Sequence, residues 1–175
     1  MAAATALTIG SGGGDTSVYY AVLAALPRER YAPVAYVAAD TDVSSQPTAT
    51  AAGALAAGVP WYAIARSREV GGSYVGAVHK VAVAVSQCLT ILRRTTPDVL
   101  LVNGPGTAFP VAAAALLLRF AGICDTHIVY VESIARVTSL SLTGKLLYPV
   151  ADAFYVQWPA LAAAYPRAVY IGIQK

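Results

Sequence analysis

The stretch His127-Ile-Val-Tyr-Val-Glu-Ser-Ile-Ala-Arg-Val-Thr-Ser-Leu-Ser-Leu-Thr-Gly-Lys145 decides the fold of this chain. It opens with a short, largely apolar and β-branched run, which predicts a strand buried on both faces of a parallel sheet. Polar residues follow at once, beginning with Glu132, and a parallel sheet places such residues in the crevice beyond its strand ends. Ser141 suits the N-cap of a helix over residues 142–150, whose first amides would suit an anion. We therefore expect an α/β protein with a ligand site at this strand end.

The rest of the chain repeats the pattern of strand, short loop and helix. Strands are expected at residues 5–9, 31–39, 59–65, 99–102, 127–131, 154–158 and 169–172, and helices at 16–26, 51–57, 74–94, 108–120, 142–150 and 159–165. The polar segment 44–50, which contains Pro47, is expected to be a loop. This alternation predicts a doubly wound, mostly parallel Rossmann-like sheet. Polar residues at successive strand ends predict one cleft along its carboxyl edge: Asp40, Arg66, Asn103, Glu132 and Gln157.

The composition fits one domain with an apolar surface. The 175 residues are 57% hydrophobic and 12% charged, and much of the apolar excess is alanine. The longest apolar run outside turns, residues 111–118, is too short for the roughly 20 residues of a spanning helix, and no signal peptide is convincing. We expect a single domain over residues 1–175, without a transmembrane anchor, whose apolar surface meets a partner or a bilayer. A net charge of +3 would help at an anionic membrane but is equally ordinary, and no nucleic-acid partner is expected.

The cysteines and histidines predict neither a metal site nor a cofactor. Cys88 and Cys124 lack a Cys-x-x-Cys spacing and lie in apolar surroundings, so we expect buried free thiols in a reducing compartment. His79 and His127 have no paired ligand spacing. We therefore expect no metal ion and no cofactor.

A glycine-rich loop follows the first expected strand. Gly10, Ser11, Gly12 and Gly13 lie between a strand and a helix, an arrangement in which backbone N–H groups can approach a phosphate. The alternative is a tight turn without a ligand. The dinucleotide fingerprint G-x-G-x-x-G fails here, because it needs glycine where Asp15 stands, and this carboxylate would itself repel a diphosphate.

Two arginines follow the third expected strand. Arg66 and Arg68 stand at its end, and guanidinium groups donate paired hydrogen bonds to phosphate oxygens. The alternative is that Arg68 and Glu69 make surface ion pairs that contribute little. We expect both arginines to hold a diphosphate together with amides of the glycine-rich loop and of Thr107.

A second glycine turn, Asn103-Gly-Pro-Gly-Thr107, follows the fourth expected strand. Pro105 makes this turn rigid and the glycines make it permissive, so the amides of Gly106 and Thr107 can face a ligand at the start of the next helix. Asn103, Gly104, Gly106 and Thr107 therefore belong to the predicted diphosphate site.

Glu132 is the predicted catalytic residue. A carboxylate within hydrogen-bond reach can deprotonate an attacking hydroxyl as general base. The alternative is structural: Glu132 would accept hydrogen bonds from backbone amides, or pair with Arg136, and so shape the following loop. Ser133 and Arg136 are predicted to bind the ligand beside it.

Two further residues each allow a structural and a ligand-binding interpretation. Asp42 follows the second expected strand, where it either caps a helix or loop or contacts the ligand. Trp158 follows the sixth strand, and at such a position packing is favoured over stacking on a sugar.

Several of these motifs resemble the membrane-recruiting subunit of the two-subunit UDP-N-acetylglucosamine transferase of asparagine-linked glycosylation. The central stretch matches that family's YVES-x-x-R-V-x-x-LS-x-[ST]-G-K pattern, and ADTD, RSREV, NGPGT and VQWP are intact. The glycine-rich loop departs from the family's GSGGHT, since Gly14 and Asp15 replace histidine and threonine. No role of that histidine carries over. The resemblance runs from Gly10 to Gly172.

The resemblance implies the N-terminal, acceptor-side half of a GT-B glycosyltransferase. The family's complex transfers N-acetylglucosamine from UDP-N-acetylglucosamine to dolichol-diphosphate-N-acetylglucosamine on the cytosolic face of the endoplasmic reticulum membrane. It implies three partners, namely a donor-binding catalytic subunit, the lipid-linked acceptor and the membrane surface, and a chain that is inactive alone. The general base for this transfer is then either Glu132 or a residue of the catalytic subunit. The family's usual N-terminal anchor helix is not expected here. The alternative is a free-standing nucleotide-sugar or dinucleotide-binding enzyme on a Rossmann-like fold, which the broken fingerprint disfavours.

Overall fold

The computed structural model describes residues 4–9, 23–24, 26–51, 53, 55–65, 74–104 and 106–172. Its strands are β1 (Ala4–Ile9), β2 (Tyr31–Ala39), β3 (Trp61–Ile64), β4 (Val99–Asn103), β5 (His127–Val131), β6 (Ala153–Val156) and β7 (Ala168–Tyr170). Within the described residues they pair in parallel as one 7-stranded sheet in the order β3-β2-β1-β4-β5-β6-β7. The predicted α/β class and doubly wound, Rossmann-like parallel sheet are therefore confirmed.

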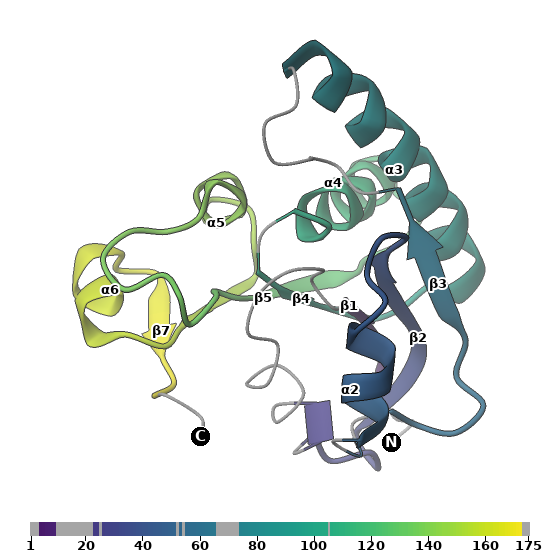
Figure 1. The fold of residues 1–175 in the computed structure, drawn as a ribbon, viewed down its shortest axis with the longest axis horizontal. Helices are drawn as coiled ribbons and strands as arrows, with labels where there is room; N and C mark the ends of the chain where they lie inside the picture. The colour runs from purple at the N-terminus through teal and green to yellow at the C-terminus, as the bar shows by residue number, and fades with distance from the viewer. Residues whose placement is uncertain are drawn as a thin grey trace.

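Helices cover both faces of this sheet. They are α2 (Ser45–Ala51), α3 (Tyr74–Thr95), α4 (Ala108–Phe120), α5 (Leu142–Leu147) and α6 (Pro159–Ala164). Figure 1 shows α3 and α4 on one face and α2 on the other. Among the helices that the structure describes, none combines the length and the apolar character needed to cross a bilayer.

The strands are buried on both faces because their side chains alternate between two cores. On β4, Leu100 and Val102 join the larger core beneath α3 and α4, whereas Leu101 joins the smaller one with Ala49 of α2. Tyr130 of β5 likewise faces the larger core. A two-residue period on a strand covered from both sides explains its nearly continuous apolar sequence.

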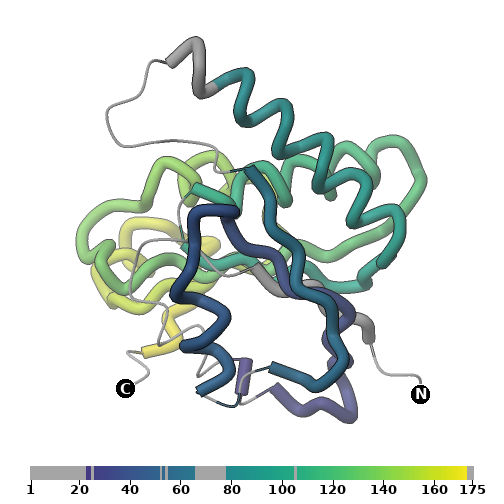
Figure 2. The backbone as a smooth tube through the Cα atoms, turned by 45° about the vertical axis from the view of Figure 1, so that its right-hand side comes forward, coloured from purple at the N-terminus to yellow at the C-terminus, as the bar shows by residue number. Residues whose placement is uncertain are grey.

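Helix α4 packs closely because its buried side is made of small residues. Ala108, Ala112 and Ala115 are almost fully buried, and α4 runs along α3 (Figures 1 and 2). The helix ends in a Schellman motif, in which Ile123 N donates to Leu118 O and Gly122 has a φ of 67°. The predicted helix over residues 108–120 is confirmed in both of its bounds.

The prediction for residues 44–57 was wrong. The expected loop is the helix α2, and the expected helix over residues 51–57 is not present where the structure describes that segment. Asp42 Oδ1 accepts hydrogen bonds from Ser44 N and Ser45 N, which caps the start of α2. Pro47 lies in the first turn, where its missing N–H has no helical partner to lose. The capping interpretation of Asp42 is therefore confirmed.

Helix α5 is shorter than expected. It begins at Leu142 as predicted, but it ends at Leu147 and not at Val150. The reason is Pro149, which cannot donate a backbone hydrogen bond to continue the ladder. The following amides of Val150 and Ala151 both donate to Leu147 O in a closing turn.

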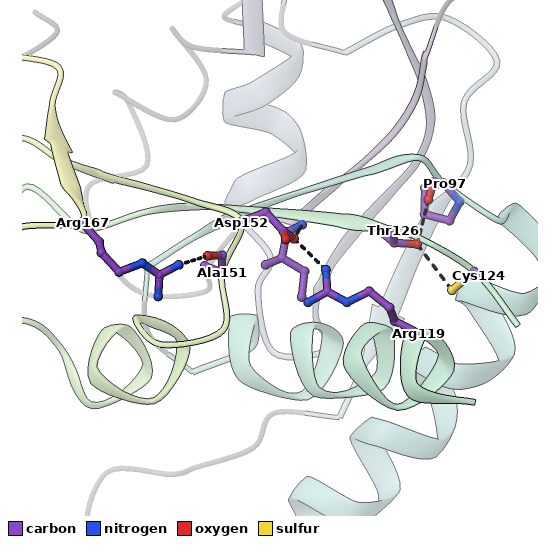
Figure 3. A network of polar contacts seen from close by, with 8 residues as sticks. Pro97, Arg119, Cys124, Thr126, Ala151, Asp152 and Arg167 are labelled. Carbon is purple, nitrogen blue, oxygen red and sulfur yellow. Dashed lines mark hydrogen bonds and ion pairs between the residues drawn. The ribbon is translucent and has the colours of Figure 1, made fainter. Parts of the chain in front are cut away.

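The amino edge of the sheet, where the strands begin, is joined by polar side chains (Figure 3). Asp152 Oδ2 accepts from Arg119 Nη1 of α4 and from Ile128 N of β5, each at 2.8 Å. Thr126 Oγ1 donates to Pro97 O at 2.8 Å, which ties the loops that precede β4 and β5. Arg167 Nη2 donates to Ala151 O at 2.9 Å.

Both cysteines are free, as predicted. Cys88 is buried in the larger core, and this burial raises the pKa of its thiol to about 12. Cys124 is half-buried, and its Sγ lies 3.5 Å from Thr126 Oγ1.

Candidate functional site

The carboxyl edge, where the strands end, brings the predicted polar residues of β4, β5 and β6 together. Asn103 ends β4 and pairs with Val131 of β5, which places Glu132 directly beyond that strand. Glu132 N donates to Tyr155 O of β6, and Gln157 follows that strand. The expected gathering of these strand ends at one edge is confirmed.

Part of the predicted site lies outside the described residues. These positions are Gly10, Ser11, Gly12, Gly13, Arg66 and Arg68. The strands that precede them, β1 and β3, belong to the same parallel sheet, and Ile9 pairs with Val102 of β4. Their predicted part in ligand binding therefore stays a prediction.

The second glycine turn has the backbone that its sequence predicts. Gly104 and Gly106 have φ values of 70° and 87°, a left-handed conformation that favours glycine. Gly104 N donates to Val131 O at 3.2 Å, and Gly106 N donates to Thr143 Oγ1 of α5 at 3.4 Å. Thr107 is buried at the N-cap of α4 and makes no side-chain capping bond. This turn thus joins the ends of β4 and β5 to the first turn of α5.

Glu132 lies beneath the surface of this edge. Its side chain is 0% exposed, and its carboxylate accepts three hydrogen bonds. Oε1 accepts from Ser133 N at 2.9 Å and from Tyr130 Oη at 3.2 Å, and Oε2 accepts from Ser141 N at 2.9 Å. These are the backbone contacts of the structural alternative. The carboxylate therefore holds both ends of the loop over residues 133–141.

Tyr130 and Ser141 extend this contact into the start of α5. Ser141 Oγ accepts from Gly144 N at 2.9 Å, which confirms Ser141 as the N-cap, and lies 3.1 Å from Tyr130 Oη. Since the tyrosine hydroxyl donates to Glu132, the serine hydroxyl is the donor to Tyr130. Burial, with the Glu132 carboxylate adding to it, raises the pKa of Tyr130 and keeps its proton in place. We call Tyr130, Glu132 and Ser141 the buried triad.

Gly144 is required by the buried triad. A Cβ at this position would collide with Glu132 Oε2 and lie 3.2 Å from Ser141 Oγ. The helix can therefore approach the carboxylate only because residue 144 has no side chain. Close packing of α5 against Glu132 therefore explains the glycine at position 144 in the family's sequence pattern.

The loop over residues 133–141 carries Arg136 into solvent, while its start is held by Trp158 at the N-cap of α6. Trp158 Nε1 donates to Ile134 O at 2.7 Å, and the Trp158 ring packs against the larger core, as predicted. Ser133 is half-buried and Arg136 is exposed. Both follow Glu132 in the loop that begins at the carboxyl edge, and their predicted ligand contacts stay predictions.

Gln157 is a site residue that the sequence did not single out for binding. It is 2% exposed, and its Nε2 donates to Glu132 O at 3.0 Å. Within the described residues, Gln157 Oε1 is a buried polar atom without a partner. The roles of Tyr130 and Gly144 were also missed, although Tyr130 and Glu132 share the two-residue period that brings side chains to one face.

No group of three potential ligands among the described residues could hold a metal ion. The described part of the site offers hydroxyl groups and the exposed guanidinium of Arg136. Such donors suit an anionic or hydroxylated ligand.

Comparison with known proteins gives the family. Residues 5–174 match the family described as "Oligosaccharide biosynthesis protein Alg14 like". The chain is 39% identical to the "UDP-N-acetylglucosamine transferase subunit ALG14" of Yarrowia lipolytica, over 92% of this chain and 76% of that protein. It is also 39% identical to the protein of the same name from Homo sapiens, over 95% of this chain and 81% of that one.

Solved structures share the fold at low sequence identity. The Acinetobacter baumannii MurG structure superimposes with a TM-score of 0.65 and 18% identity, over 90% of this chain and 42% of that one. A UDP-N-acetylglucosamine 2-epimerase gives a TM-score of 0.66 and 11% identity, over 96% of this chain and 48% of that one. The chain thus has the fold of GT-B proteins but spans less than half the length of these structures. On its family match and its relatives, this chain belongs to the Alg14-like oligosaccharide biosynthesis proteins.

Proposed function

We propose that this chain is the acceptor-binding subunit of a UDP-N-acetylglucosamine transferase. The proposal rests on the length of this chain compared with the lengths of the proteins that it resembles. The chain has one Rossmann-like sheet and spans 42% of the MurG structure, yet it covers 81% of a human relative that is named a transferase subunit. A second protein would therefore supply the donor-binding half, and the cleft between the halves would be the active site.

The proposed reaction adds the second N-acetylglucosamine to dolichol-diphosphate-N-acetylglucosamine during synthesis of the N-linked glycan precursor. In this proposal the chain recruits its catalytic partner to the cytosolic face of the endoplasmic reticulum membrane. The resemblance of the central stretch to the asparagine-linked glycosylation family supports this reaction and the recruitment. The names of the relatives support only the coarser statement of a subunit of a UDP-N-acetylglucosamine transferase.

The acceptor's diphosphate would bind at the carboxyl edge. The left-handed turn at Gly104 and Gly106 precedes the N-terminus of α4, and helix N-termini favour negative charge. Arg136 is exposed at the same edge, and Arg66 and Arg68 are proposed to complete the site with the glycine-rich loop. Guanidinium groups match phosphate oxygens in charge and geometry.

Two roles are possible for Glu132 within this proposal. As a general base it would contact the acceptor hydroxyl, whereas its burial and its three hydrogen bonds support a positioning role through the loop over residues 133–141. Glu132→Gln in the reconstituted complex separates the two. A base requires a fall in kcat of roughly 100-fold or more with the acceptor KM unchanged. A positioning residue predicts a raised acceptor KM.

Reconstitution tests the proposed function itself. The purified chain is mixed with its candidate donor-binding partner, UDP-N-acetylglucosamine and a lipid-diphosphate-linked N-acetylglucosamine, and sugar transfer is measured. We expect transfer only when both proteins are present. Robust turnover by the chain alone would contradict the proposal and favour a free-standing nucleotide-sugar enzyme.

A further inference from the structure

The exposed side of α5 and the loop before it combine apolar and basic side chains. On α5, Leu142 and Leu146 are 65% and 48% exposed, and Lys145 is exposed beside them. In the loop, Val137 is 43% exposed and its neighbour Arg136 is exposed. We call these five residues the α5 surface.

The helical part of the α5 surface is one face of a well-anchored helix. Leu142, Lys145 and Leu146 are three and four positions apart, so they share one side of the helix. The opposite side, with Thr143, Gly144 and Leu147, is buried against the rest of the molecule. Figure 1 shows α5 at the periphery of the molecule. Because the buried triad holds its first turn, the two leucines are presented on a fixed scaffold.

The charges of this surface have one sign. Residues 133–151 contain Arg136 and Lys145 but neither aspartate nor glutamate. The nearest carboxylate in the sequence on the amino-terminal side, Glu132, is buried and bonded to its own donors. On the carboxyl-terminal side, Asp152 is paired with Arg119 at the amino edge. The two cations of the α5 surface therefore face outward without a carboxylate from their own segment.

We propose that the α5 surface docks into the headgroup region of a bilayer that contains anionic lipids. Leucine with flanking lysine and arginine is the pattern of interfacial helices, whose apolar side chains enter the acyl boundary while cations reach anionic headgroups. A protein partner fits less well, because lysine is depleted in the cores of protein interfaces. A second copy fits less well again, since a two-fold contact through this face would bring like charges together.

This inference rests on the proposed function, since a lipid-linked acceptor must reach the carboxyl edge from a bilayer. Ser141 N and Thr143 Oγ1 tie the start of α5 to Glu132 and to the second glycine turn at that edge. A bilayer at the α5 surface would therefore lie beside the site proposed for the diphosphate.

Vesicle sedimentation tests the inference with the full chain alone. We expect it to bind vesicles of phosphatidylcholine with phosphatidylserine, and to bind vesicles of phosphatidylcholine alone much more weakly. The double variant Leu142→Ser/Leu146→Ser should bind the anionic vesicles at least about tenfold more weakly, because two partly inserted side chains are lost. Lys145→Glu, which keeps both leucines, should bind about tenfold more weakly as well.

The matched control lies at the carboxyl-terminal end of α4, beside the amino edge of the sheet. Leu117 and Phe120 at the end of α4 are 53% and 84% exposed, and Leu117→Ser/Phe120→Ser should leave vesicle binding unchanged. Circular dichroism identifies any variant that fails to fold. If the double leucine variant does not fold, the vesicle binding of Lys145→Glu decides the test. Absence of wild-type binding would overturn the inference, and so would equal losses in the α4 control.

Two further outcomes separate this inference from the proposed function. If the α5 variants bind vesicles normally but no longer co-purify with the donor-binding partner, the surface is a protein interface and the inference fails. If wild-type chain binds anionic vesicles through α5 but never supports sugar transfer with the partner, the inference holds and the proposed function fails.

Discussion

The carboxyl and amino edges of the sheet are each tied together by one carboxylate, but the surroundings differ. At the carboxyl edge, Glu132 is 0% exposed and accepts from two backbone amides and a tyrosine hydroxyl. At the amino edge, the side chain of Asp152 is 34% exposed and accepts from one amide and the Arg119 guanidinium (Figure 3). The buried carboxylate accepts hydrogen bonds from uncharged donors, whereas the exposed one is part of an ion pair.

The difference teaches that burial, more than formal charge pairing, sets how much each carboxylate matters. A buried donor that loses its acceptor cannot bond to water instead, and each such donor costs about 1–3 kcal/mol of stability. An exposed ion pair is worth only about 0–1 kcal/mol because water and salt screen it. Substitutions at the two edges should therefore differ several-fold in their effect on stability.

The largest effect is expected from Glu132→Ala. This change leaves the amides of Ser133 and Ser141 and the hydroxyl of Tyr130 without their acceptor, so we expect the free energy of unfolding to fall by about 3 kcal/mol or more. Urea unfolding followed by circular dichroism measures it. Glu132→Gln, which keeps one acceptor oxygen, should lose about half as much. A loss from Glu132→Ala below about 0.5 kcal/mol would show that the two edges do not differ.

Gly144→Ala should follow, with a loss of about 2 kcal/mol. Alanine normally stabilises a helix relative to glycine by about 1 kcal/mol, so a loss here would report the collision of the new Cβ with Glu132. A double-mutant cycle sharpens the test. In the Glu132→Ala background the collision partner is gone, so Gly144→Ala should cost clearly less there. Equal costs in both backgrounds would place the strain elsewhere.

Tyr130→Phe should lose about 1 kcal/mol, the worth of its hydrogen bonds to Glu132 and Ser141. Because burial raises the pKa of Tyr130, its stabilising contribution is complete below the unfolded pKa of about 10 and is lost as pH rises further. The wild-type protein should therefore lose more stability than Tyr130→Phe above about pH 10. Parallel pH dependences of the two proteins would exclude this contribution.

The smallest effect is expected at the amino edge, from Asp152→Asn. Desolvation alone would raise the pKa of Asp152, but hydrogen bonds from Ile128 N and Arg119 outweigh it and hold the pKa below 3.8. The contribution is therefore present above that value and lost as pH falls below it. We expect a loss below about 1 kcal/mol at pH 7, smaller still in 1 M salt. A salt-independent loss of several kcal/mol would remove the contrast between the edges.

Much of the architecture could be predicted because local patterns carry it. The helix over residues 108–120 and the strands over 31–39 and 127–131 match their predicted bounds. The segment 44–57 could not be predicted from Pro47, because the helix there depends on a cap from Asp42 that lies outside the helical pattern. Helix α5 ended early for a local reason, Pro149, which the pattern contains.

The candidate site was also predictable only in part. The order of strand ends along a parallel sheet predicted that Asn103, Glu132 and Gln157 share one edge. The parallel pairing of β5 with β4 and with β6 confirms this prediction. The sequence could not show how far each side chain reaches into solvent. Ser141 N is nine residues from Glu132 in the chain, and the Gln157 amide is 25 residues away, yet both contact it.

By itself, then, the sequence determined the α/β class, the parallel sheet, the glycine turn at Gly104 and Gly106 and the family resemblance. Each of these follows from residue types and spacings that act over a few neighbouring positions. Only the tertiary structure decided that Glu132 is buried, that Tyr130 and Ser141 share its carboxylate, and that residue 144 must be glycine. Those facts depend on how closely β5, β6 and α5 approach one another, and this distance is set by packing across the whole sheet.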